Sequence, residues 1–150
     1  MIRTTTALAT AVTFLALPVA AQSTFERLEA VAVTMNGMMF DAMVAQTPAL
    51  EGNMPSAEWS DGLRTAYQCM YDGFVDRVGE PAMADMVSQM EAQLDTITAE
   101  EVLMGGGDIE NPEGLTDEQA QEIVANCGMM DAFMAHMSAS GALQILMQDD

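Results

Sequence analysis

Apolar residues recur every three or four positions along four segments of this chain, and this spacing constrains the fold more than any other feature. The segments run over residues 28–42, 59–78, 83–97 and 116–148. This spacing is that of an amphipathic α-helix, whereas a half-buried strand alternates with a period of two. No run of β-branched and aromatic residues alternates in that way. The sequence therefore predicts an all-α fold, a small up-and-down bundle of about four helices.

Capping signals mark where these helices begin and end. Residues 23–26 and 116–119 each fit a capping box, in which a Ser or Thr and a Glu or Gln bind free amides at a helix start. Ser56 is the expected cap of the second helix, Gly79 ends that helix, and Pro48 ends the first. The last helix is expected to continue to about residue 148.

Residues 1–21 have the pattern of a secretory signal peptide. One positive charge, Arg3, precedes an apolar run over residues 8–17, and a small-residue cleavage site follows before Gln22. We therefore expect residues 1–21 to be cleaved and residues 22–150 to form a single acidic helical domain, in a bacterial periplasm or secreted. No later segment offers about 18 uninterrupted apolar residues, so no membrane span is expected.

The chain is strongly acidic: it holds 4 Lys+Arg against 23 Asp+Glu, a formal charge of −19. Nucleic acids and anionic membrane surfaces bind basic faces of proteins, so this charge argues against both as partners. The acidic surface has two explanations. It is either an adaptation to a salty medium, in which it stays solvated, or it serves a basic partner or a store of cations.

Two cysteines, Cys69 and Cys127, predict one disulfide bond, because an exported chain folds in an oxidising compartment. The helix of Cys69 carries a line of small residues beside it that would let another helix approach closely: Gly62, Ala66 and Gly73. A bond closing so long a loop stabilises a fold by about 4 kcal/mol in the chain-entropy model. The cysteines form no C-x-x-C pair, which argues against a redox role.

The chain has 16 methionines, an unusual number for its length. Those in residues 35–43, 83–90 and 129–137 have the spacing of a single helix face. In the simplest interpretation Met replaces Leu as core filler. In a second, the thioethers and His136 bind Cu(I), and in a third a flexible Met-lined surface binds apolar helices of varied sequence. We predict no metal ligand and no cofactor.

The last predicted helix is apolar on two faces. One face would pack into the bundle and carries Cys127, Ile123, Met130, Met134 and Ile145. The other is the predicted interface and carries Met129, Phe133, His136, Leu143 and Met147. A bundle helix needs one apolar stripe, so a loop, another subunit or a ligand must cover the second. The Gly-rich acidic loop before residue 116 is too polar for this, which predicts an unknown protein partner or self-association.

Catalytic motifs are missing from the sequence. It has no G-x-S-x-G and no phosphate-binding glycine loop with its lysine. We therefore expect no catalytic residue and no enzyme. The preferred hypothesis is an exported, non-enzymatic helical domain that binds a protein or a small apolar ligand. The alternative is a methionine-based Cu(I)-binding protein.

Overall fold

The computed structural model describes residues 22–104 and 110–148. The predicted signal peptide, residues 1–21, lies outside the described residues, as do residues 105–109 in the Gly-rich loop and the last two residues. Every regular element in the described part of the chain is a helix, which confirms the all-α prediction.

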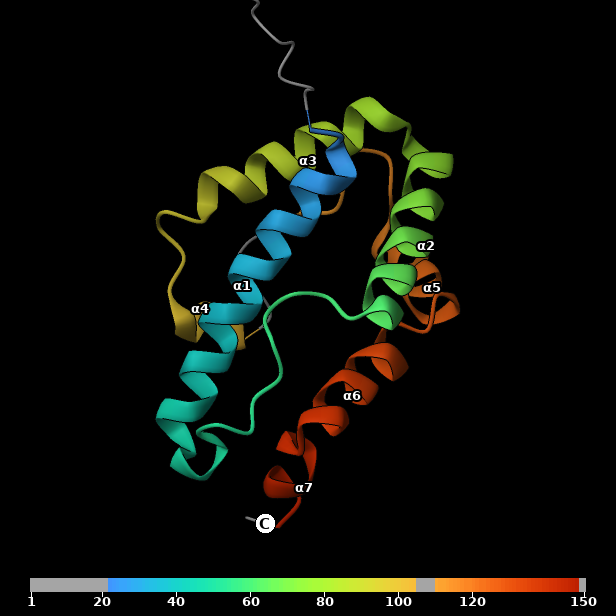
Figure 1. Ribbon diagram of the computed structural model, residues 1–150. Coiled ribbons are helices and arrows are strands. Elements are labelled where there is room, and N and C mark those ends of the chain that lie inside the picture. Colours follow the sequence, from blue (N-terminus) through green and yellow to red (C-terminus); the bar gives the residue numbers. More distant parts are fainter. Residues whose placement is uncertain (1–21, 105–109, 149–150) are drawn as a thin grey trace, which may run out of the picture.

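Seven α-helices and one 3-10 helix form the described fold (Figure 1). In chain order they are α1 (Thr24–Gln46), η1 (Pro48–Leu50), α2 (Asp61–Val78), α3 (Glu80–Gln93), α4 (Ala99–Leu103), α5 (Asp117–Asn126), α6 (Met129–Ser140) and α7 (Ala142–Leu146).

The capping signals placed most helix ends correctly. Both predicted capping boxes are present, at the starts of α1 and α5. Gly79 ends α2 with a positive φ of 83°, a backbone conformation that favours glycine. The predicted cap at Ser56 is wrong: Ser60 caps α2 instead, and its side chain accepts a hydrogen bond from the Leu63 amide.

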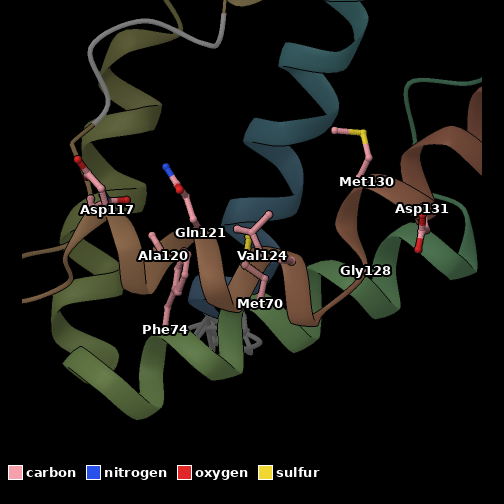
Figure 2. Close-up of a pocket in the computed structure, with 11 residues that line it drawn as sticks. Met70, Phe74, Asp117, Ala120, Gln121, Val124, Gly128, Met130 and Asp131 are labelled. Atoms are coloured by element: carbon pink, nitrogen blue, oxygen red, sulfur yellow. The ribbon is translucent and has the colours of Figure 1, made fainter.

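The single last helix predicted over residues 116–148 is wrong, because two glycines divide it into α5, α6 and α7. Gly128 (φ 64°) lies between α5 and α6, as Figure 2 shows, and Gly141 (φ 91°) lies between α6 and α7. Each break changes the direction of the chain, so helical facing does not carry over from α5 to α6. Met130 and Met134, expected to face the bundle, are 71% and 40% exposed.

The helices close into a ring, which differs from the predicted up-and-down bundle. α1 packs against α3 and α4, α3 against α2, and α2 against α5 and α6. From there α6 contacts α7, α7 contacts η1, and η1 returns to α1. Loop 51–60 runs across this ring in the view of Figure 1, from η1 to α2.

Two hydrophobic clusters lie at opposite ends of α1. The first cluster joins the N-terminal half of α1 to α2, α3 and α5, and its buried members are Phe25, Leu28, Tyr71, Phe74, Met83, Met86, Val87, Leu115 and Ala120. The second cluster joins the C-terminal half of α1 to η1, α6 and α7, and its buried members are Phe40, Leu50, Met137 and Ala142.

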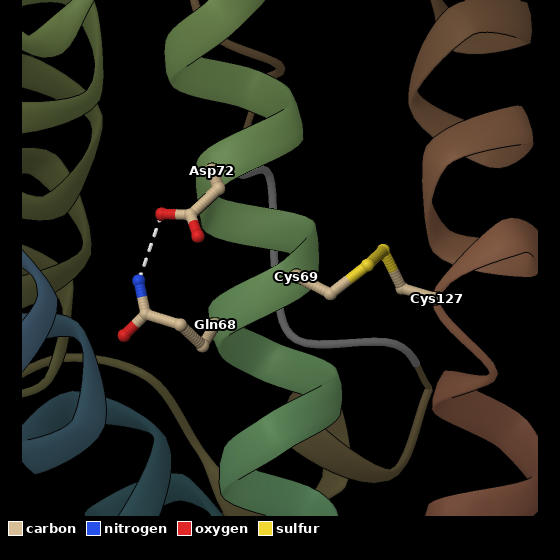
Figure 3. The surroundings of a disulfide bond; sticks show 4 residues. All are labelled: Gln68, Cys69, Asp72 and Cys127. Carbon is tan, nitrogen blue, oxygen red and sulfur yellow. Dashed lines mark hydrogen bonds between the residues drawn. A yellow bond between two sulfur atoms is a disulfide. The ribbon is translucent and has the colours of Figure 1, made fainter.

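The predicted disulfide is confirmed: Cys69 of α2 is bonded to Cys127 at the end of α5 (Figure 3), with 5.6 Å between their Cα atoms. Three small residues, Gly62, Ala66 and Gly73, were expected to allow this approach. A Cβ added at Gly73 would lie 2.8 Å from Cγ2 of Ile123 in α5, whereas one added at Gly62 would meet nothing within 4 Å. The bond is consistent with an oxidising compartment.

Helix α1 is long and apolar enough, by length and composition alone, to cross a membrane. In the fold it forms one wall of the ring and carries charged side chains that pair with other helices. Arg27 is bonded to Glu91 of α3, and Glu29 is paired with Arg64 of α2. That no segment spans a membrane stays a prediction.

Candidate functional site

A methionine-lined cavity of about 420 Å³ lies between the two clusters. Five helices contribute its walls: α1, α2, α3, α4 and α6. Its lining residues are Leu28, Ala32, Met35, Asn36, Met39, Tyr67, Met70, Met86, Met90, Val102 and Phe133. The cavity is therefore built from most of the helices rather than held on a single loop, and it is open to the surface.

The ring arrangement explains why this space stays open. α1 and α2 meet through side chains such as Phe25 and Tyr71, whose ring centroids are 5.4 Å apart, rather than by close packing of their backbones. Five of the eleven side chains that line this space are flexible thioethers. Methionine has three rotatable bonds and a polarisable sulfur, so it lines irregular spaces and adapts to what enters them.

Two helices, α1 and α3, each contribute to the cavity wall a pair of methionines that are four residues apart. Met35 and Met39 lie on one face of α1, and Met86 and Met90 lie on one face of α3. The shared faces were predicted from these spacings. The meeting of the two faces across a cavity, with Met70 of α2 beside them, was not.

Polar groups are few at this site. Asn36 lies at the edge of loop 51–60, where its Nδ2 donates to the carbonyl oxygen of Ala57 at 3.2 Å, so one donor of this amide is bonded within the chain. Tyr67 stacks on Trp59, with ring centroids 4.0 Å apart, and burial raises the pKa of its hydroxyl. No Asp, Glu, Lys, Arg or His lines the cavity. The described residues contain no group of three or more His, Cys, Asp or Glu side chains able to hold a metal ion.

The size and the apolar wall of this cavity are those of a small-molecule binding site. Ligand cavities of small molecules are mostly apolar, have volumes of about 300–1,000 Å³ and carry a few polar groups that orient the ligand. Acid–base and nucleophilic catalysis both need a titratable or activated side chain near the reacting atoms, and the cavity wall offers only the Tyr67 hydroxyl.

The predicted interface residues are spread over different surroundings. Phe133 lines the cavity and packs on the second cluster, where Leu143 also packs. His136 donates from Nε2 to the carbonyl oxygen of Ser56 at 2.9 Å. Met129 is half-buried, and Met147 is 73% exposed.

Much of the second apolar stripe is thus covered from within the chain. From the sequence, the loop before residue 116 is the candidate cover within the chain, and it is too polar to serve as one. The cover comes instead from η1 and the C-terminal half of α1, which form the second cluster with Phe133 and Leu143. Association of this face with a partner or a second copy stays a prediction.

Sequence reasoning missed Tyr67, Val102 and Asn36 as lining residues. The available signal was the repeated four-residue spacing of methionines in two separate helices, which marks faces that tolerate irregular packing.

Comparison with known proteins finds no family model, no curated protein and no solved structure that matches the chain.

Proposed function

We propose that this protein binds a small apolar molecule in the methionine-lined cavity, as a non-enzymatic carrier or sensor outside the cytoplasm. The observation that carries the proposal is a cavity whose wall is apolar on five helices, with the Asn36 amide already bonded within the chain. Contact with such a wall favours binding of an apolar ligand, because apolar surface is removed from water and no charged side chain has to be desolvated. The disulfide and the signal-like residues 1–21 favour the periplasm or the medium as its place of action.

The test uses the neutral fluorophore N-phenyl-1-naphthylamine, whose emission rises in apolar surroundings. We expect saturable binding to the oxidised mature protein. The double variant Met35→Gln, Met39→Gln places two amides in the cavity wall. It should weaken binding by about tenfold or more, because each unpaired amide in an apolar site costs about 1 kcal/mol or more.

The matched control is Met134→Gln, Met147→Gln, the same change at two exposed methionines that do not line the cavity. It should leave dye binding within about twofold of the parent, since no desolvated site is altered. Equal weakening in both double variants, or no binding by the parent, would overturn the proposal. Circular dichroism checks that both variants keep their helices.

A second candidate function is Cu(I) binding, favoured by the five thioethers that line one cavity. Thioethers are soft ligands that select Cu(I) over harder ions. Titration with Cu(I) under anaerobic conditions, against bathocuproine disulfonate as the competing chelator, tests it. Stoichiometric transfer to the parent and its loss in Met35→Gln, Met39→Gln would support this function. Copper that stays with the chelator would contradict it.

A further inference from the structure

A second concave surface lies outside the ring, along α5. It is an open groove of about 740 Å³ between α5, α2 and the start of α6 (Figure 2). The residues that line it are Met70, Phe74, Asn111, Asp117, Ala120, Gln121, Val124, Ala125, Gly128, Met130 and Asp131. This groove shares only Met70 with the cavity, so what it binds is a separate question.

One face of α5 forms the length of the groove. Its residues 117, 120, 121, 124 and 125 follow the three- and four-residue spacing of a single helix face. Three positions along it, Ala120, Ala125 and Gly128, have small or no side chains, which let another backbone approach closely. Phe74 and Val124 supply an apolar floor, and Met130, 71% exposed, stands at one end.

Two carboxylates stand at opposite ends of this apolar surface. Asp117 begins α5 and Asp131 lies in the first turn of α6, and Figure 2 shows them at the two ends of the row of lining residues. Asp117 accepts a hydrogen bond from Nδ2 of Asn111 at 2.6 Å, which fixes its place at the groove edge. No Arg or Lys lines the groove, so both carboxylates lack a cationic partner there.

We propose that the groove docks an amphipathic helix of a partner protein that carries Lys or Arg beside its apolar face. The apolar face of such a helix would lie on Phe74, Val124 and Met130, along the small residues of α5. Its cationic side chains would reach Asp117 and Asp131. The charge of −19 on this chain attracts a basic partner over distance and disfavours an acidic one.

The test uses a fluorescein-labelled synthetic helix with leucines on one face and lysines on the other, followed by anisotropy at physiological salt. The oxidised parent protein should bind it, and an otherwise identical peptide with Glu in place of Lys should not bind. Asp117→Asn, Asp131→Asn should weaken binding by about tenfold, since both charge pairs with the lysines of the peptide are lost. Ala125→Trp, which fills the groove at an exposed position, should weaken binding as strongly.

The matched control is Asp41→Asn, Asp95→Asn, which makes the same change in net charge at exposed positions away from the groove. It should change binding by less than about twofold, because charges farther away than a Debye length are screened. If both double variants weakened peptide binding equally, binding would depend only on the net charge of the protein and not on the groove. That result, or full binding by Ala125→Trp, overturns the proposal, as does equal binding of the Glu peptide. Circular dichroism and thiol titration confirm that each variant is folded and oxidised.

Discussion

The first and second clusters are held together by different means. In the first, the ring of Phe25 lies 5.9 Å from that of Trp59 and 5.4 Å from that of Tyr71, and the Arg27–Glu91 pair and the disulfide bridge its helices. The hydroxyl of Tyr71 donates to Glu80 at 2.6 Å, and burial together with this carboxylate raises the pKa of Tyr71 to about 12.

The second cluster is held by fewer interactions between its elements, and no disulfide bridges them. It buries Phe40, Leu50, Met137 and Ala142 between one end of α1 and the short elements η1 and α7. The hydrogen bond from His136 to Ser56 is the long-range side-chain bond that holds α6 to loop 51–60. Regions with fewer buried contacts and no covalent tie open more readily than the rest of a fold. The cavity lies between the clusters, so we expect opening of the second to move the part of the cavity wall that packs on it, at Met39 and Phe133.

The largest test of this comparison removes the covalent tie. Cys69→Ala, Cys127→Ala should lower the free energy of unfolding by about 4 kcal/mol, because the unfolded chain regains the entropy of a long loop. Urea unfolding of the parent and the variant measures the difference. Reduction of the parent should produce a similar loss, and purified parent protein should show no free thiol. A loss below about 1 kcal/mol would mean that the disulfide is not what strengthens this side of the molecule.

The second test truncates one buried leucine in each cluster. Leu28→Ala in the first cluster and Leu50→Ala in the second each remove a side chain that is almost fully buried, at a cost of about 3 kcal/mol. Amide hydrogen exchange should distinguish the two variants. We expect faster exchange throughout the molecule for Leu28→Ala, and faster exchange confined to η1, α7 and the end of α1 for Leu50→Ala. The same exchange pattern in both variants would contradict the difference between the clusters.

The third test compares two glycines inside helices. An alanine at Gly73 would place Cβ 2.8 Å from Ile123, whereas at Gly37 the nearest contact is Ala57 at 3.9 Å. Alanine gains about 1 kcal/mol over glycine in a helix, and overpacking costs about 1–3 kcal/mol. Gly73→Ala should therefore destabilise by about 1 kcal/mol and Gly37→Ala should stabilise by about as much. Thermal unfolding measures both, and stabilisation by both would show that α2 and α5 are not tightly packed.

Local signals in the sequence were enough to predict the helical class, most helix ends and the disulfide. The capping boxes at residues 23–26 and 116–119 depend on neighbours three positions apart, so they need no knowledge of the rest of the chain. The cysteine pair needed only export and a line of small residues. Ser56 was misplaced as a cap because Ser60 offers the same side chain four residues later, at the start of α2.

The ring and the cavity could not be predicted from local signals. Glycine is tolerated inside a helix and also favours a left-handed turn, and the sequence around Gly128 and Gly141 does not decide between these. Once both break the chain, α7 meets η1, and Phe133 and Leu143 of the predicted interface pack on the second cluster. The methionine faces of α1 and α3 were visible, but their meeting depends on contacts between residues far apart in sequence.

The smallest expected effect concerns the polar edge of the first cluster. Hydrogen bonds from Thr24 and from Tyr71 lower the pKa of Glu80. A carboxyl group whose pKa is lowered in the folded state contributes stability at pH values above about 4.5, its ordinary pKa. This contribution is lost as the pH falls through the lowered pKa of the folded state. Glu80 is exposed, so screening limits the contribution to less than about 1 kcal/mol.

Glu80→Gln should therefore be less stable than the parent at pH 7, and the difference should be smaller near about pH 3, because protonation of the Glu80 carboxylate increases as the pH falls below its ordinary pKa. The matched control is Glu58→Gln, which removes the same charge from an exposed side chain whose carboxylate makes no hydrogen bond within the described residues. Because the chain carries −19, either substitution also relieves repulsion, and the control measures that gain. Urea unfolding at both pH values gives the two differences. If Glu80→Gln follows the control at pH 7, the bond from Tyr71 does not stabilise the first cluster, and its strength comes from its buried side chains, the Arg27–Glu91 pair and the disulfide.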